Sequence, residues 1–474
     1  MQRSPFRSAL AALVFLAGCS GSYLSSGPMV NAGGSPGGGA TVGGLKDLKL
    51  ARATVAAGQV PEPEAWAVEG LYAEHDLPVG GAACTEAFCV RAAGAVAPDL
   101  NGERNVGWVQ LGLSSNINPQ TLQRPALDLA LVIDVSCSMG GEGIKMAREA
   151  ATQAIDNLDE GDILQIVKFD DNATLVSPRG PVVNKDALKA KVSALVPEGS
   201  TCISCGMSVA YANYPFNSPD PTRNRRVVVI TDAMPNVGST TQTDLAADIE
   251  QHASASGIFT TVVGVSLSFD QDLVRKISAV KGANSHFLST VEDATKLFGE
   301  DFKLWVTPVA YDLDLELRPK AGLTVAAMHG VPGADAAAAK SHIASVFLSR
   351  ERGALVARLD QPADPGAELG TLSLSYQDLE GQTQSDSVTV LAPAQAAPAY
   401  DGPSTRKALA LTRFALGARE ACALYQQGQF IEAAQKGDAV ADALEAEAAA
   451  IQDAGLNDEA VFARKLADLL GKPQ

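Results

Sequence analysis

The stretch Leu129-Ala130-Leu131-Val132-Ile133-Asp134-Val135-Ser136-Cys137-Ser138 decides the predicted fold of this 474-residue chain. Its first half is an unbroken apolar run, which is typical of a strand buried on both faces of a parallel sheet. Its second half places an acid and two hydroxyls directly after that strand. A second apolar run, Val227 to Ile230, ends in the same way at Thr231 and Asp232. Because ligands bind beyond the carboxyl ends of strands in open α/β sheets, both ends are candidate sites.

Strands and helices alternate along the middle of the chain. Apolar residues recur at helical spacing from Ile144 to Leu158, and further strands are predicted over Ile163–Phe169 and Ile258–Val265. Helices are predicted between the strands, over 185–195, 243–254 and 271–280. This alternation indicates βαβ units, so we predict an α/β domain over 126–308 with a doubly wound, mainly parallel sheet.

The flanking segments have different patterns. Leu313, Leu315 and Leu317 alternate with acidic residues, which predicts a half-buried strand and a β-sandwich-like domain over 309–393. Residues 45–125 combine short apolar runs with turns and are expected to be mostly β. Residues 394–474 contain a linker and then amphipathic, Ala-rich stretches, which predict two or three packed helices.

The N-terminus has the pattern of an export signal. Arg3 and Arg7 precede a short apolar core, and Leu16-Ala17-Gly18-Cys19 resembles the lipobox of bacterial lipoproteins. Residues 1–18 are then a lipoprotein signal peptide, Cys19 is the lipidated residue, and residues 19–44 are a Gly/Ser-rich tether. This predicts a protein anchored in the cell envelope, in the outer membrane or at the cell surface. The alternative is an ordinary signal peptide with a chance cysteine.

The net charge of −17 argues against nucleic acid as a partner, because phosphate binding needs a basic face. Six cysteines remain after Cys19, in a context that favours disulfides. Candidates for disulfide bonds are Cys84, Cys89, Cys137, Cys202 and Cys205. The first two are close enough to close a small loop, and Cys137 is expected to lie near enough to pair with Cys202 or Cys205. Free thiols and a zinc site built from the last three are the alternatives.

Three separate loops contribute oxygen-bearing side chains that suit one hard cation. The candidate ligands are Asp134, Ser136, Ser138, Thr201 and Asp232. Two carboxylates brought to one crevice repel each other unless a positive charge lies between them, which favours a metal ion. The alternative is that Asp134 and Asp232 only cap helices and bind loop amides.

The spacing Asp134-x-Ser136-x-Ser138, followed by Thr201 and then Asp232, resembles the metal-ion-dependent adhesion site (MIDAS) of von Willebrand factor type A domains. The lipobox and the β segment after the domain are similar to a bacterial group of exported type A proteins, some of them labelled calcium-activated chloride channel-like. The resemblance implies direct binding of the ion by the two serine hydroxyls. Thr201 would bind directly or through water, and the two aspartates mostly through water.

The resemblance also implies the function. Hydroxyl ligands leave the ion electron-poor with one position open, where an acidic residue of a protein partner binds. Mg²⁺ is expected at the site, with Mn²⁺ and Ca²⁺ as alternatives, and no small-molecule substrate is expected. Cys137 and Ala233 depart from the family, which commonly has glycine at both positions.

Two other functions are considered. In the first, the protein is an envelope scaffold that docks partners through its C-terminal helices. In the second, it is a metal-dependent phosphohydrolase of the haloacid dehalogenase type. Those enzymes place a second aspartate two residues after the first, where this chain has Ser136. We therefore expect the protein not to be an enzyme.

Overall fold

The computed structural model describes residues 39–42 and 48–472, apart from 101, 103, 120, 216–221, 233–237, 239–240, 266–275, 278, 331–333 and 350–351. Cys19 and the predicted signal peptide lie outside the described residues, as do Ala233 and most of the helix predicted over 271–280. Among the described residues, no helix has the length and apolar character needed to cross a membrane.

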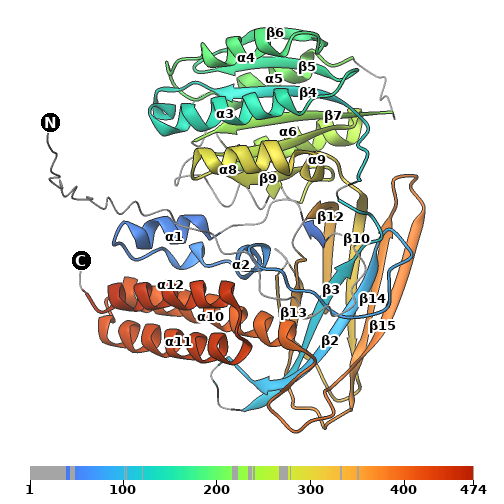
Figure 1. Ribbon diagram of the computed structural model, residues 1–474, viewed down its shortest axis with the longest axis vertical. Coiled ribbons are helices and arrows are strands. Elements are labelled where there is room, and N and C mark those ends of the chain that lie inside the picture. The colour runs from blue at the N-terminus through green and yellow to red at the C-terminus, as the bar shows by residue number, and fades with distance from the viewer. Residues whose placement is uncertain are drawn as a thin grey trace, which may run out of the picture. The chain divides into compact units, whose positions relative to one another are not determined.

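The α/β domain is built on a six-stranded sheet with the order β6-β5-β4-β7-β8-β9 (Figure 1). The strands are β4 (Ala126–Asp134), β5 (Ile163–Phe169), β6 (Ala173–Pro181), β7 (Arg223–Thr231), β8 (Ile258–Gly264) and β9 (Asn284–Phe287). Neighbouring strands are parallel except for the antiparallel pair β5 and β6. Because β4 lies between β5 and β7, the chain proceeds outward from β4 in both directions, and the reversal point lies there.

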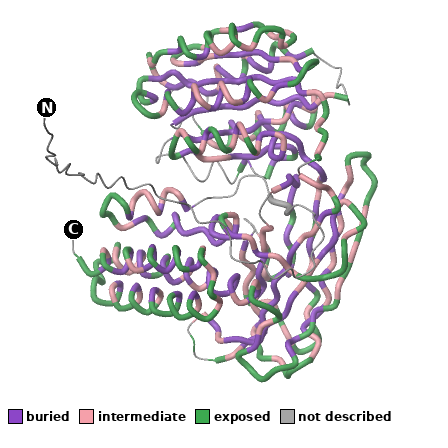
Figure 2. Tube along the Cα trace, viewed as in Figure 1, coloured by how far each residue is buried: buried purple, intermediate pink, exposed green. Residues whose placement is uncertain are grey.

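Helices cover both faces of this sheet. They are α3 (Glu142–Asp156), α4 (Lys185–Ser193), α5 (Ile203–Ala212), α6 (Gln242–Ser256), α8 (Val291–Thr295), the π-helical turn Lys296–Glu300 and α9 (Phe302–Trp305). Leu129 and Leu131 of β4 pack with α3 on one face, whereas Ala130 and Val132 pack with α5 and α6 on the other. The strands are accordingly buried between two apolar layers (Figure 2). The predicted doubly wound, mainly parallel sheet is confirmed.

Two five-stranded sheets form a β-sandwich. One has the order β1-β12-β10-β14-β15 and the other β11-β13-β3-β2-β16. Their bounds are β1 (Gly39–Val42), β2 (Cys89–Pro98), β3 (Asn105–Ser114), β10 (Ala310–Pro319), β11 (Val325–His329), β12 (Lys340–Ser349), β13 (Leu355–Leu359), β14 (Glu368–Gln377), β15 (Thr383–Leu391) and β16 (Ala399–Tyr400). Strands from both sides of the α/β domain in sequence share these sheets, since β3 pairs with β13.

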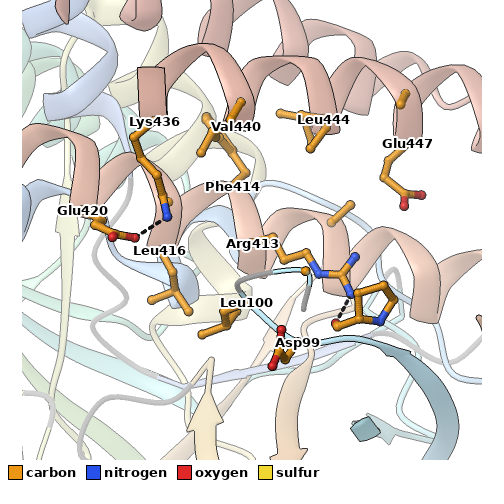
Figure 3. Close-up of a pocket in the computed structure, with 17 residues that line it drawn as sticks. Asp99, Leu100, Arg413, Phe414, Leu416, Glu420, Lys436, Val440, Leu444 and Glu447 are labelled. Atoms are coloured by element: carbon orange, nitrogen blue, oxygen red, sulfur yellow. Dashed lines mark hydrogen bonds and ion pairs between the residues drawn. The ribbon is translucent and has the colours of Figure 1, made fainter. Parts of the chain in front are cut away.

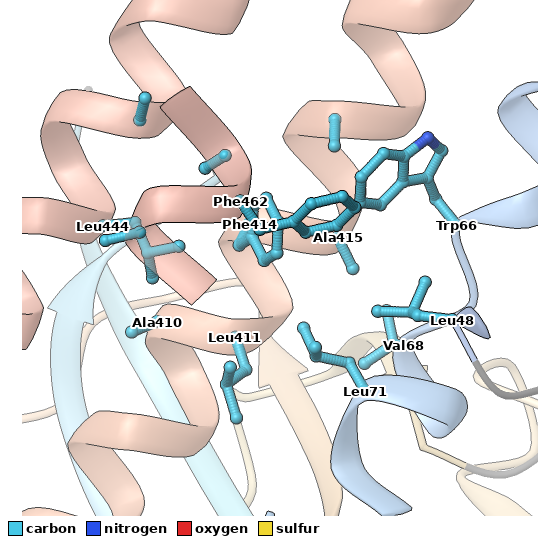
Figure 4. Packing of buried hydrophobic residues seen from close by; sticks show 14 of the residues in the cluster. Leu48, Trp66, Val68, Leu71, Ala410, Leu411, Phe414, Ala415, Leu444 and Phe462 are labelled. Carbon is cyan, nitrogen blue, oxygen red and sulfur yellow. The ribbon is translucent and has the colours of Figure 1, made fainter. Parts of the chain in front are cut away.

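The remaining helices form a third core. They are α1 (Lys49–Ala56), the 3-10 turn Pro63–Ala65, α2 (Val68–Ala73), α10 (Pro403–Gln426), α11 (Phe430–Ile451) and α12 (Ala454–Leu470). The ring centroid of Trp66 lies 5.5 Å from that of Phe414 and 5.6 Å from that of Phe462 (Figure 4). The segment expected to be mostly β therefore also supplies two short helices, which pack on the predicted C-terminal helices.

Candidate metal centre

Three loops meet at the carboxyl ends of the parallel strands. The first is residues 134–138 after β4, the second is residues 198–202 before α5, and the third begins at Asp232 after β7. Backbone hydrogen bonds join the first two loops, because Cys137 N donates to Gly199 O at 3.1 Å and Glu198 N donates to Val135 O at 2.5 Å. The second loop is also bound to the end of β5 through Cys202 N and Asp170 O, 2.8 Å apart.

A continuous chain of hydrogen bonds links the two predicted carboxylates. Ser136 N donates to Asp134 Oδ1 at 2.8 Å, and the hydroxyls of Ser136 and Ser138 are 3.0 Å apart. Ser138 Oγ then donates to Asp232 Oδ1 at 2.9 Å. Four of the five candidate ligands are therefore in one connected group, although they come from two loops that are about a hundred residues apart.

Thr201, the fifth candidate, is positioned by its backbone neighbours. Its residue is 2% exposed. It lies between Gly199, whose carbonyl accepts from Cys137, and Cys202, whose N–H donates to Asp170. These backbone contacts bring the second loop, with Thr201, against the first.

Thr231 also contributes to the group, although it is not one of the five candidate ligands. Its Oγ1 donates to Asp134 Oδ2 at 2.5 Å, so both oxygens of that carboxylate accept hydrogen bonds. It is the last residue of β7 and is fully buried. The sequence signal was a hydroxyl that ends an otherwise apolar strand directly before Asp232.

The electrostatics of the site favour a cation. Burial, with a smaller contribution from the charge of Asp232, raises the pKa of Asp134 to about 6 despite the hydrogen bonds from Thr231 and Ser136. Burial also raises the pKa of Asp232, against the hydrogen bond from Ser138. Within the part of the chain that the structure describes, neither carboxylate pairs with a Lys, Arg or His. Two ionisable acids without a counter-charge fit a site for a positive ion.

The donor set and the exposure of the site indicate which ion fits. Asp134 and Ser136 are buried, whereas Ser138 is exposed, so the group is covered on one side and reaches solvent on the other. All five side chains offer oxygen, the donor preferred by Mg²⁺, Mn²⁺ and Ca²⁺. The residues therefore fit a hard divalent cation that is held near the surface.

The cysteines differ from one expectation. Cys84 bonds to Cys89, as anticipated, but Cys202 bonds to Cys205 rather than to Cys137. The correction has a simple cause, since Cys137 starts a 3-10 turn that leaves its thiol free and exposed while Cys202 is buried at the start of α5. The disulfide also removes two of the three thiolates that the alternative zinc site would need.

The class of this protein is defined by an α/β domain with a group of oxygen-bearing side chains at the carboxyl ends of its strands. The model of the von Willebrand factor type A domain matches residues 128–300. Those residues are therefore a von Willebrand factor type A domain.

Relatives are known by sequence and by structure. Uncharacterized protein sll0103 of Synechocystis sp. is 27% identical over 205 residues, which cover 43% of this chain and 48% of that protein. Uncharacterized protein YfbK of Escherichia coli is 24% identical over 195 residues, which cover 41% of this chain and 34% of that protein. This chain therefore matches less than half of the length of either relative.

The solved structure of a von Willebrand factor type A protein from Catenulispora acidiphila covers 82% of this chain and 90% of its own, with a TM-score of 0.52 at 17% identity. At this identity, the similarity supports the fold alone.

Proposed function

We propose that the three loops bind one divalent cation, with Mg²⁺ as the first choice and Mn²⁺ or Ca²⁺ as alternatives. Ser136, Ser138 and Thr201 supply hydroxyl ligands, and Asp134 and Asp232 act mostly through water. The single observation that carries the proposal is the hydrogen-bonded chain from Asp134 to Asp232, which contains two acids and no cationic side chain.

The bound cation serves protein recognition in this proposal. Type A domains mediate protein–protein interaction, and the exposed Ser138 marks the side from which a partner can approach. Neutral hydroxyl ligands leave most of the cation's charge uncompensated, so an acidic residue of the partner completes its coordination. The proposed role is adhesion or assembly rather than catalysis.

The proposed location is the bacterial cell envelope. The lipobox-like sequence that ends in Cys19 would attach the mature chain to lipid, in the outer membrane or at the cell surface. Disulfides at Cys84–Cys89 and Cys202–Cys205 agree with an oxidising compartment. Labelling cells with radioactive palmitate tests the anchor: the wild-type chain incorporates label and the Cys19→Ala variant does not.

Thermal denaturation tests the metal site. Mg²⁺ added to EDTA-treated protein should raise the melting temperature, because a ligand bound only by the folded state stabilises it by about 2.7 kcal/mol at a hundredfold excess over its Kd. Asp134→Ala should abolish the shift. Asp186→Ala is the matched control, since that side chain is 95% exposed on α4 and should leave the shift intact. An equal shift in the wild type and Asp134→Ala would contradict the proposal.

A pull-down from envelope extract tests the role in recognition. Partners should bind in Mg²⁺ and be released by EDTA, and Asp134→Ala should behave as the wild type does in EDTA. Partners retained equally in both buffers would instead support the scaffold function, with docking through the C-terminal helices.

A further inference from the structure

A cavity of about 520 Å³ lies between α10, α11 and the turn that joins β2 to β3 (Figure 3). Its apolar wall includes Leu100 of the turn, Phe414 and Leu416 of α10, and Val440 and Leu444 of α11. Small-molecule sites typically measure ~300–1,000 Å³ and have mainly apolar walls. No lining residue comes from the α/β domain, so this site is separate from the metal centre.

Most of the charged side chains at the cavity already have partners. Glu420 of α10 pairs with Lys436 of α11 at 2.5 Å. Glu447 pairs with Arg406 at 2.6 Å. These pairs hold the two helices together at separate points along the cavity. They leave little net charge for a ligand to neutralise at either point.

Arg413 is the exception. Its Nη2 donates to the carbonyl of Pro98, and its Nε is buried without a hydrogen-bond partner. The guanidinium carbon lies 6.0 Å from the centre of the Trp108 ring. Among the described residues, no carboxylate pairs with Arg413. A guanidinium has five N–H donors, and one neutral carbonyl uses only part of that capacity.

We propose that this cavity binds an apolar monocarboxylate of the medium-chain fatty acid class. Its carboxylate binds the guanidinium of Arg413, and its chain lies along Phe414, Val440 and Leu444. Arginine and carboxylate form strong, charge-assisted hydrogen bonds, whereas a neutral ligand oxygen accepts only weaker hydrogen bonds from the same Nη groups. Ligands with several negative charges are disfavoured, because Arg413 is the single lining cation among the described residues without a carboxylate partner and because Asp99, Glu420 and Glu447 also line the cavity.

The probe is dodecanoate, titrated calorimetrically into the full chain below its micelle concentration. The wild type should bind it, and Arg413→Met should weaken binding by at least about tenfold, because a hydrogen bond to a charged group is lost. Dodecanol should bind at least about tenfold more weakly than dodecanoate. The matched control is Arg464→Met on α12, which removes an arginine that does not line the cavity and should bind as the wild type does.

A second variant keeps the test decisive if Arg413→Met folds poorly. Ala443 is exposed at the rim of the cavity, so Ala443→Phe should fold normally and block entry of the chain. Failure of the wild type to bind dodecanoate would overturn the proposal, as would unchanged affinity in Arg413→Met or Ala443→Phe. Repeating the titration in EDTA separates this site from the metal centre, since the result should not change.

Discussion

Asp134 illustrates how much of the candidate site could be predicted from residue types. An acid and hydroxyls that follow an apolar strand are visible in sequence, and the structure places Asp134, Ser136, Ser138 and Asp232 in one hydrogen-bonded group. Residue types do not show whether a side chain in the loop points into the protein or toward solvent. Cys137 is exposed because the 3-10 turn buries Met139 instead, and that choice depends on backbone geometry.

Thr231→Val tests whether Mg²⁺ binding needs the hydrogen bond that Thr231 donates to Oδ2 of Asp134. Valine keeps the shape of threonine but removes the donor at 2.5 Å, so a buried carboxylate oxygen loses its partner at a cost of about 1–3 kcal/mol. The pKa of Asp134 should rise further above its usual range. We expect roughly tenfold weaker Mg²⁺ binding, measured from the Mg²⁺ dependence of the melting temperature.

Thr260→Val is the control for that substitution. Thr260 is a buried threonine on the neighbouring strand β8, and its hydroxyl lies 2.7 Å from the Tyr211 hydroxyl rather than at the site. Its loss should lower stability and leave the Mg²⁺ dependence unchanged. Equal effects of both substitutions on Mg²⁺ binding would mean that Thr231 has no specific role.

At the scale of elements, hydrophobic periodicity predicts the strands and helices well. It does not predict the contacts that hold the loops between them in place. The strand over Ile163–Phe169 has the predicted bounds, and α6 extends the predicted helix by only one or two residues at each end. The loop before α5 is different. Gly199 has a φ of +67°, and a Cβ there would lie 2.7 Å from Asp171 Oδ2, so glycine is needed for this close approach. Such contacts join distant segments and leave no periodic signal.

The disulfide at the start of α5 should matter for the metal site as well as for stability. It joins Cys202, directly after Thr201, to Cys205 in the first turn of the helix. Because the closed loop is short, replacing both cysteines by serine should cost only about 1–2 kcal/mol. We expect Mg²⁺ binding to weaken roughly tenfold, because Thr201 loses its fixed position and must be ordered on binding.

Replacing Cys84 and Cys89 by serine is the matched control. This pair closes a loop of similar length at the start of β2, far in sequence from the three metal loops. Its removal should reduce stability by a comparable amount without changing the Mg²⁺ midpoint in thermal denaturation. If both double variants bind Mg²⁺ as the wild type does, the Cys202–Cys205 disulfide does not position Thr201.

At the scale of the whole molecule, the sequence indicated β segments on both sides of the α/β domain but not that they share sheets. A period-two pattern predicts a strand and its buried face. Which strand pairs with it in the sheet is set by contacts between segments that are distant in sequence. Arg226, a buried arginine of β7, connects the α/β domain to the β-sandwich. It bonds to Gly282 O at 3.1 Å, and its guanidinium lies 5.7 Å from the ring of Phe347 in β12.

Two histidines should make the stability of the molecule depend on pH. Burial, together with the positive charges of Lys49 and Arg226, lowers the pKa of His286 to about 3. Burial likewise lowers the pKa of His329 to about 4. Since an unfolded histidine has a pKa near 6.5, the unfolded chain binds more protons below that pH. The stability that depends on these neutral histidines is fully present above pH 6.5 and is lost as the pH falls toward 3 or 4.

Urea denaturation between pH 7.5 and 4.5 measures this effect. Each histidine should lower the free energy of unfolding by up to about 1.4 kcal/mol per pH unit below 6.5. His286→Gln should flatten the dependence, and His329→Gln should do so independently. In the double variant the two reductions in pH dependence should add, because the two residues lie in separate sheets, on β9 and β11. A dependence as steep in the double variant as in the wild type would assign the acid sensitivity to carboxylates instead.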